Sequence, residues 1–156
     1  MALTVYIETT IPSYYVDKRA ELVREIARTR QWWDRERVAY ECFVSQFVLE
    51  ELEQGRESRS AARLALVADI PLLAFRDEVL EVAEVYWAHK LMPRLPVRDA
   101  LHLAMASYYK LDVLLTWNCR HLANVNKAAH LARINRMLNL PVPILATPWQ
   151  LELPEE

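Results

Sequence analysis

Short apolar segments alternate with helical patterns along the chain, and this alternation constrains the fold more than any other feature of the sequence. Five segments have the composition of strands: "LTVYI" (3–7), "AYECFVS" (39–45), "IPLLAF" (70–75), "LDVLLTW" (111–117) and "VPILA" (142–146). Helices are expected between them, at about 17–37, 46–57, 76–90, 97–109 and 122–138, and a basic, Ala-rich helical stretch is expected before the third strand. Thr9, Thr10 and Pro12 also supply start signals for a helix directly after the first strand. This order predicts right-handed crossovers, so the expected α/β fold is a three-layer α/β/α sandwich around a central, mainly parallel sheet of about five strands.

The composition is that of one globular domain. The 156 residues are 53% hydrophobic and 26% charged, and no internal repeat, linker or low-complexity segment divides them. We therefore expect a single domain over residues 1–156. No apolar run reaches the roughly 18 residues of a membrane span, and the N-terminus lacks the features of a secretion signal. A cytoplasmic location without membrane contact is expected.

The rarest residues exclude several classes of site. Phosphate-binding loops of nucleotide sites need several glycines, and the chain has only Gly55. The GxSxG motif of serine hydrolases is missing as well. Cys42 and Cys119 are too few for a disulfide framework and lack the spacing of zinc ligands.

Charge is distributed unevenly along the chain. Residues 113–151 contain no Asp or Glu and carry four cationic residues, Arg120, Lys127, Arg133 and Arg136. This segment therefore has a net charge of +4, and since the whole chain carries −2, the remainder carries −6. The basic segment fits either a solvated helix or contact with phosphate groups.

Polar side chains follow two of the predicted strands. Glu8 comes directly after the first strand, and "LLTWN" places Thr116 and Asn118 where the fourth strand ends. Ligands of open parallel sheets bind outside the carboxyl ends of the strands, so these residues are expected at one edge of the sheet. Glu8 could instead be a loop carboxylate near a helix N-terminus. Asn118 fits a neutral oxygen ligand or a group that positions water.

Helical geometry separates the acidic residues of "SQFVLEELEQG". At about 100° per residue, Glu51 shares the side of the helix that carries the apolar residues, whereas Glu50 points away. Glu53 and Glu57 have ordinary solvent-facing positions on the same helix. Glu51 is therefore the acidic residue of this run that is expected to face the protein.

A third acidic residue lies on a helix that is apolar nearly all round. In "PVRDALHLAMASYY", Asp99 falls in the first turn, where it could complement the helix dipole, but it shares a stripe with apolar residues and is expected to point toward protein. His102 fits a hydrogen-bonded structural histidine better than a ligand. Cys119 and His121 do not fit a nucleophile pair, because residues two apart after a strand rarely face one another.

Taken together, these residues resemble the PIN domain, the fold of the VapC-type ribonuclease toxins. Four stretches carry the resemblance over essentially the whole chain: "VYIETTIPSYY" with Glu8, "VSQFVLEEL" with Glu51, "VRDALHLAMA" with Asp99 and "LLTWNCRHLAN" with Asn118. Position 8 has Glu where the family usually has Asp, and position 118 has Asn where many members have a fourth Asp. Together with "ET" and "TWNCRH", this looks like a PIN subgroup with a variant site.

The resemblance implies a metal-dependent ribonuclease. Three carboxylates in one pocket would raise one another's pKa values unless a cation lies among them, and Mg²⁺ or Mn²⁺ prefers such oxygen ligands. Glu8 and Asp99 are expected as direct ligands. Glu51 would be a ligand or an outer base, and Asn118 would orient a metal-bound water. The implied reaction is hydrolysis of RNA phosphodiester bonds with the 3′-oxygen as leaving group.

The resemblance also implies partners. Candidates for binding the RNA substrate are Thr116, Arg120, Lys127 and Arg133. Four aromatic residues could stack bases, form a dimer surface or belong to the core: Tyr14, Tyr15, Trp32 and Trp33. A homodimer is expected and, for the toxin of a type II toxin–antitoxin pair, a small antitoxin protein.

Two other functions remain open from the sequence. Asn118 could leave a PIN-like module that binds RNA or a protein without cutting RNA. The chain could also be a PIN nuclease outside any toxin system.

Overall fold

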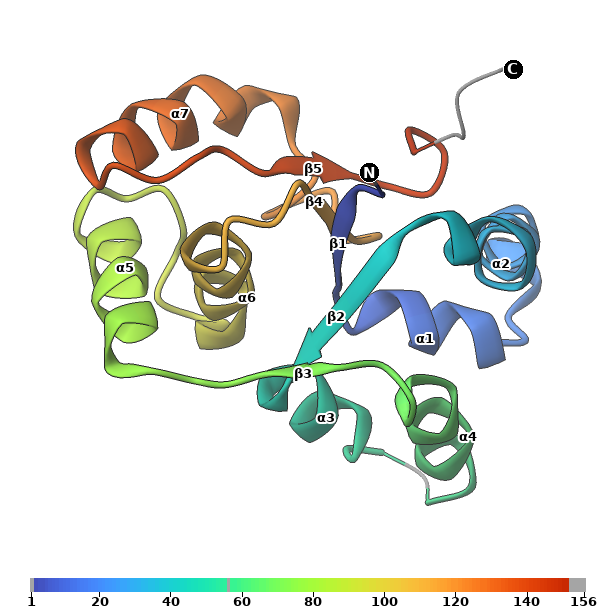
Figure 1. The fold of residues 1–156 in the computed structure, drawn as a ribbon. Helices are drawn as coiled ribbons and strands as arrows, with labels where there is room; N and C mark the ends of the chain where they lie inside the picture. The colour runs from blue at the N-terminus through green and yellow to red at the C-terminus, as the bar shows by residue number, and fades with distance from the viewer. Residues whose placement is uncertain (1, 56, 152–156) are drawn as a thin grey trace.

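A parallel five-stranded sheet lies at the centre of the molecule. The computed structural model describes residues 2–55 and 57–151 (Figure 1). The strands are β1 (Thr4–Ile7), β2 (Glu41–Ser45), β3 (Leu72–Leu73), β4 (Val113–Leu115) and β5 (Ile144–Ala146). Their spatial order is β3-β2-β1-β4-β5, and all neighbouring strands are parallel. The chain changes direction across the sheet between β1 and β4, which is where ligands of such sheets bind.

Helices cover both faces of the sheet. They are α1 (Thr10–Val16), α2 (Val23–Gln31), α3 (Gln46–Leu52), α4 (Glu57–Val67), α5 (Asp77–Ala88), α6 (Val97–Tyr108) and α7 (Ala128–Met137). Figure 1 shows α1, α2 and α4 on one side of the sheet and α5, α6 and α7 on the other. The predicted three-layer α/β/α architecture is confirmed. Within the described part of the chain, no helix has the length and hydrophobicity needed to cross a bilayer.

The helix predicted at 17–37 is wrong at its start. Residues 10–16 form the separate helix α1, and α2 begins only at Val23 before it continues as a π-helical turn, Trp32–Glu36. The backbone is extended at Asp17 and Arg19. There the Asp17 carboxylate accepts hydrogen bonds from the Arg19 backbone N–H and guanidinium, which competes with a continuous helix.

Several further elements are shorter than predicted, and the helix expected at 122–138 begins only at Ala128. The helix expected at 46–57 ends at Leu52, and Gly55 then adopts a φ of +100°, a left-handed conformation that favours glycine. The strand expected at 70–75 pairs only at Leu72–Leu73.

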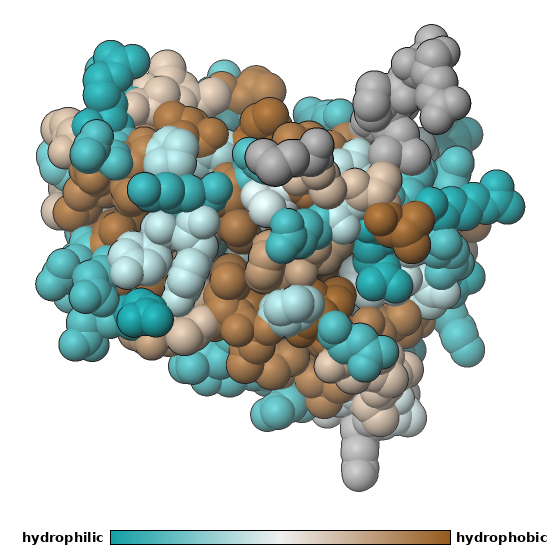
Figure 2. All heavy atoms as spheres, viewed as in Figure 1, coloured by the Kyte–Doolittle hydropathy of each residue, from teal (hydrophilic) through white to brown (hydrophobic). Residues whose placement is uncertain are grey.

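The two edge strands, β3 and β5, leave Leu72 and Ile144 more than half exposed. Figure 2, in the same view, shows hydrophobic residues in the middle of this face and hydrophilic residues mainly around them.

The core packs against the two central strands and α6. All three residues of β4 and Val5, Tyr6 and Ile7 of β1 are inaccessible to solvent. Helix α6 is buried continuously from Asp99 to Ser107, as its apolar composition predicts. Polar side chains on such a helix need partners inside the protein, which directs attention to Asp99 and His102.

The tryptophans at the end of α2 belong to the core. Trp32 is 0% exposed and Trp33 is 4% exposed, and their rings pack on each other. The possibility that these two residues stack bases is therefore wrong. Tyr14 and Tyr15 are only partly buried.

Candidate metal centre

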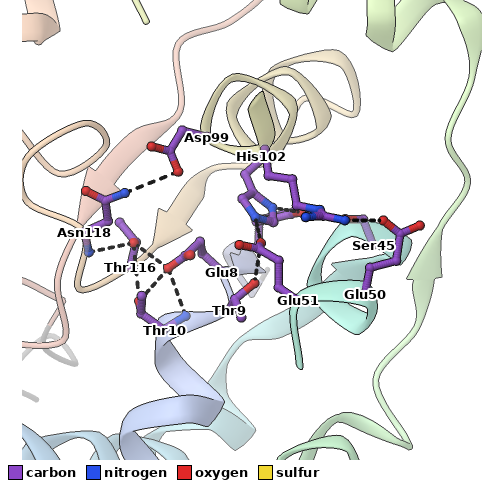
Figure 3. Close-up of polar contacts among 12 residues, drawn as sticks. Glu8, Thr9, Thr10, Ser45, Glu50, Glu51, Asp99, His102, Thr116 and Asn118 are labelled. Atoms are coloured by element: carbon purple, nitrogen blue, oxygen red, sulfur yellow. Dashed lines mark hydrogen bonds and ion pairs between the residues drawn. The ribbon is translucent and has the colours of Figure 1, made fainter. Parts of the chain in front are cut away.

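Glu8 lies at the carboxyl end of β1 and is only 4% exposed. Its backbone N–H donates to the Leu115 carbonyl at 3.1 Å, which extends the pairing with β4. Its Oε1 accepts hydrogen bonds from the Thr10 N–H (3.1 Å), the Thr10 hydroxyl (2.5 Å) and the Thr116 hydroxyl (2.7 Å; Figure 3). Among the described residues no donor reaches Oε2. One oxygen thus fixes the carboxylate and the other is available to a ligand.

Glu51 approaches Glu8 from the last turn of α3. Its Oε1 accepts a hydrogen bond from the Thr9 hydroxyl at 2.8 Å and lies 2.5 Å from His102 Nε2. The neighbouring Glu50 points away and pairs with Arg98 at 3.0 Å near the surface. The structure therefore confirms the orientation of the two acids that helical geometry predicts.

His102 connects Glu51 to a chain of buried hydroxyl groups. Its Nδ1 lies 2.7 Å from the Tyr6 hydroxyl, which in turn lies 2.7 Å from the Ser45 hydroxyl. An ionised carboxylate can only accept, so Nε2 carries a hydrogen. Nδ1 accepts from Tyr6 when the ring is neutral and donates to Tyr6 when the ring is protonated, and Ser45 is the second partner of the Tyr6 hydroxyl in both states. His102 and Ser45 are both 0% exposed, so the network fixes Glu51 from inside the core.

The two carboxylates respond differently to their surroundings. Burial raises the pKa of Glu8, although the His102 charge and the hydrogen bonds from Thr10 and Thr116 oppose this effect. Burial also acts to raise the pKa of Glu51, but the hydrogen bond and charge of His102 outweigh it, so the pKa of Glu51 is lowered. Atoms of ligand type in Glu8, Glu51 and His102 lie within 4.8 Å of one another, but His102 Nε2 is already bonded to Glu51, so the two carboxylates are the groups left for a ligand. The donors fit a cation between the carboxylates.

A second acidic group lies beside this cluster. Asp99, at the start of α6, is 7% exposed. Its Oδ2 lies 2.7 Å from His121 Nδ1, and its Oδ1 accepts a weak hydrogen bond from the Asn118 amide at 3.4 Å. The Asn118 side-chain Oδ1 accepts from the His121 backbone N–H at 3.0 Å. Figure 3 shows Glu8 between this group and the Glu51–His102 pair.

The family model that matches this chain is described as "PIN domain" and covers residues 5–128, which is most of the sequence. The chain belongs to the PIN domain family. PIN domains are typically metal-dependent nucleases and use divalent ions. A comparison with curated proteins gives no match. The match includes all four strand-end and helix positions on which the resemblance rests, Glu8, Glu51, Asp99 and Asn118.

The structure brings some of the predicted PIN-domain site residues closer together than others. Glu8 and Glu51 fall within one possible ligand set, with His102 as its third member. In the described chain, Asp99 does not join this set and is paired with His121. Asn118 lies beside Asp99 and contacts it through its amide nitrogen.

The predicted substrate-binding residues have different surroundings. Thr116 is 0% exposed and its hydroxyl donates to Glu8, so it holds the site from within. Lys127 is partly buried and donates to the His121 carbonyl oxygen at 3.3 Å; burial lowers its pKa. Arg120 and Arg133 are exposed on the surface.

The sequence predicts the positions of the acidic residues better than it predicts their hydrogen-bond partners. It treated His102 as structural, and the structure shows a buried histidine that both connects to the core and contacts a candidate ligand. His121 entered only as a possible partner of Cys119, whereas it pairs with Asp99. Thr9 and Thr10 appeared only as helix-start signals, but their hydroxyls donate to the two glutamates. The "ETT" triplet was the available signal, because hydroxyls beside a buried acid are its nearest donors.

Proposed function

We propose that this PIN domain is a metal-dependent endoribonuclease that hydrolyses phosphodiester bonds of RNA. The observation that carries the proposal is the approach of Glu8 and Glu51 at the carboxyl edge of the sheet, with ligand atoms within 4.8 Å. Two carboxylates this close repel each other unless one is protonated or a cation lies between them. Neutral hydroxyl and amide donors hold Glu8, so its charge is left for an external cation.

The donor set favours Mg²⁺ or Mn²⁺. These ions prefer carboxylate oxygens and keep positions open for water and phosphate. We assign Glu8, Glu51 and Asp99 as the residues that would hold the ion. His102 is assigned as the residue that orients Glu51, because the hydrogen on its Nε2 already bonds that carboxylate.

The cation and the protein contribute different parts of the chemistry. When bound, the divalent ion supplies the positive charge that polarises a phosphate and lowers the pKa of a water. Glu51 serves as a ligand or accepts the proton of the attacking water, supported by His102 and Thr9. Asn118 presents a neutral amide beside Asp99, where it can orient water without adding charge.

Basic residues outside the site are proposed to bind the RNA backbone. Arg120 and Arg133 are exposed and lie in the segment that has no acidic residue. Lys127 is proposed for the same role and also holds the His121 loop through the carbonyl oxygen of that residue. Such contacts give affinity that falls with salt and carry little sequence information.

We further propose a biological setting. The chain would act as the toxin of a type II toxin–antitoxin pair, as a single cytoplasmic domain over residues 1–156 that forms a homodimer and is inhibited by a small antitoxin. Exposed apolar residues on the edge strands, Leu72 and Ile144, provide surface for protein contacts. Growth arrest on expression, relieved by a protein encoded next to this chain, would separate a toxin from a PIN nuclease of RNA processing or repair.

A second candidate is a PIN-like module that binds RNA or a protein without cutting RNA. The observation that favours it is Asn118, whose amide donates to Asp99 where a fourth carboxylate would repel it. This candidate predicts binding without turnover, and gain of cleavage in Asn118→Asp.

Cleavage of labelled single-stranded RNA by the purified protein tests both candidates. The reaction is run with Mn²⁺, Mg²⁺ or EDTA, and Glu51→Gln is compared with Glu50→Gln. These variants remove one charge from adjacent positions of α3, one toward the site and one toward solvent. We expect metal-dependent cleavage that falls by at least about 100-fold in Glu51→Gln and less than about twofold in Glu50→Gln.

Other outcomes decide against the nuclease. Cleavage that persists in EDTA, or that is equally reduced in both variants, would contradict a metal site at Glu51. RNA binding without cleavage by the wild type, with cleavage gained in Asn118→Asp, would support the binding module.

A further inference from the structure

An aromatic cluster lies beside the candidate metal centre, and neither the family match nor the proposed mechanism accounts for it. We propose that Tyr14, Trp117 and Trp149 form a stacking site for an unpaired base of the RNA substrate. The proposal rests on the proposed function in taking RNA as the ligand. To that function it adds a site that holds a single-stranded segment of the RNA next to the acidic residues.

The cluster has a fixed geometry. The Tyr14 and Trp117 rings are stacked, with centroids 5.5 Å apart and planes 11° from parallel. Trp149 meets Trp117 edge-on, at 6.2 Å and 78°. The Trp117 indole N–H donates to the hydroxyl of Thr29, which is 0% exposed, at 2.8 Å. A ring held in this way loses little conformational freedom when a base stacks against the cluster.

Hydrogen bonds connect the cluster directly to the acidic site. The Trp117 backbone N–H donates to the Thr10 hydroxyl at 2.8 Å, and the same hydroxyl donates to Glu8. Trp117 also lies between Thr116, which holds Glu8, and Asn118, which contacts Asp99. A base on this cluster would therefore lie close to the phosphate that the acids are proposed to hold.

Trp149 reaches the same edge of the sheet from β5. The Thr116 N–H pairs with the Ala146 carbonyl at 2.9 Å, so β4 and β5 end side by side. A turn then presents Trp149: the Gln150 N–H donates to the Thr147 carbonyl, and the Gln150 side chain accepts from the Thr147 N–H, both at 2.9 Å. Trp149 remains 50% exposed, whereas Trp32 and Trp33 are buried.

Charge favours a nucleic acid over an acidic or apolar protein segment as the occupant. Trp117 and Trp149 both belong to residues 113–151, which contain no acidic residue and carry a net charge of +4. Arg120, three residues after Trp117, is exposed. The charges near Tyr14 are mixed, with Arg19 beside Asp17 and Glu25, so the positive contribution comes from the segment that carries Trp117 and Trp149. Aromatic rings combined with cationic residues bind single-stranded RNA, because every base offers a flat face and every linkage a negative charge.

Binding of single-stranded RNA to the full chain in EDTA tests the proposal without cleavage. Two labelled 12-nucleotide probes of equal charge are compared: an RNA of mixed sequence and an abasic ribose-phosphate strand. We expect the wild type to bind RNA roughly tenfold more tightly than the abasic strand, as stacking of one base provides. Trp149→Ala should remove this difference, and Trp149→Phe should retain most of it.

Val125→Ala is the matched control, since Val125 is an exposed apolar residue of the same acid-free segment. Equal binding of the two probes by the wild type, or an unchanged ratio in Trp149→Ala, would overturn the stacking site. An unchanged ratio with weakened self-association would assign Trp149 to a protein contact and likewise overturn it. Binding in EDTA is independent of turnover: a base-dependent ratio without any cleavage would keep this inference and reject the nuclease, and cleavage without base dependence would do the reverse.

Discussion

Two histidine–carboxylate pairs flank Glu8, and they are built in different ways. In the Glu51–His102 pair the histidine is 0% exposed, and its second nitrogen continues to Tyr6 and Ser45 in the core. In the Asp99–His121 pair the histidine side chain is 20% exposed and lies on the loop after β4. Asp99 and His102 both come from α6, so the two pairs share one helix but differ in what supports them.

The difference indicates which half of the site is rigid. Every polar atom of His102 and the Tyr6 hydroxyl has a partner within the protein, and both residues are 0% exposed, so moving one group leaves another unsatisfied. His121 is supported by its backbone contacts with Asn118 and Lys127, where water can replace lost partners. We infer that the Glu51 half is fixed before a ligand arrives and that the Asp99 half adjusts to it.

The largest expected effect comes from removing the two histidines separately. His102→Ala should lower the free energy of unfolding by about 3 kcal/mol, because it leaves a cavity and takes one of the two hydrogen-bond partners from the buried Tyr6 hydroxyl. His121→Ala should lower it by less than about 1 kcal/mol, since this side chain reaches solvent. Urea unfolding in EDTA measures both values. Equal losses would show that the two pairs are supported alike.

A smaller effect tests the chain behind His102. Tyr6→Phe removes the hydroxyl that joins Ser45 to His102 and should cost about 1–2 kcal/mol. The matched control is Tyr15→Phe, whose hydroxyl bonds Asp34 at the surface and should cost less than about 0.5 kcal/mol. If Tyr6→Phe costs no more than its control, the rigidity of the Glu51 half does not come from this network.

The third effect concerns the adjustable half. Asn118→Asp places a carboxylate beside Asp99, which is unfavourable without a cation and favourable with one. We expect Mn²⁺ to bind roughly tenfold more tightly, about 1.4 kcal/mol, as measured by calorimetric titration. Asp99→Asn should change the affinity in the opposite direction. Unchanged affinity in both variants would exclude the Asp99 half from metal binding.

The smallest expected effect is a pH dependence of the stability that Glu51, in the fixed half of the site, contributes to the fold. Burial acts to raise the pKa of Glu51, but the hydrogen bond and charge of His102 outweigh it and lower the pKa below the ordinary value of 4.5. A depressed carboxyl pKa contributes stability above 4.5, and that contribution is lost as pH falls through the lower folded-state value. The side chain is 28% exposed, so solvent reduces the effect.

Melting temperatures between pH 3 and 7 in EDTA show this contribution as the difference between wild type and Glu51→Gln. The wild-type advantage should shrink below about pH 4.5, and Glu50→Gln should show no such trend. An advantage that grows toward acid pH would mean that the pKa of Glu51 is raised.

The comparison also shows where sequence reasoning succeeds. The sheet and its carboxyl edge are predicted from the alternation of strands and helices, because the spacing of apolar residues, every two residues in a strand and every 3.6 in a helix, is a property of the local sequence. The choice of Glu51 over Glu50 follows from one helix and is confirmed by the contacts of both side chains. Glu8 and Asn118 were placed at one edge by the strands that precede them.

The site contacts that the sequence does not predict join residues that lie far apart along the chain. The pairing of Asp99 with His121 crosses 22 residues and two elements, and no local pattern encodes it. The Tyr6–His102 contact joins residues 96 positions apart. The break between α1 and α2 is not predicted, because helix propensity is a weak signal beside one aspartate, Asp17, whose carboxylate accepts a hydrogen bond from the backbone N–H of Arg19.

The position of β1 has a consequence for synthesis. It precedes the other four described strands in the sequence, yet it lies between β2 and β4, and the hydroxyl of Thr116 that holds Glu8 is 108 residues further along the chain. A nascent chain that ends before β4 contains both glutamates but neither the second neighbour of β1 nor the loop that carries Asn118 and His121. The site therefore assembles only after β4 and the loop that follows it have left the ribosome, and whatever chemistry it performs is withheld from the message being translated until then.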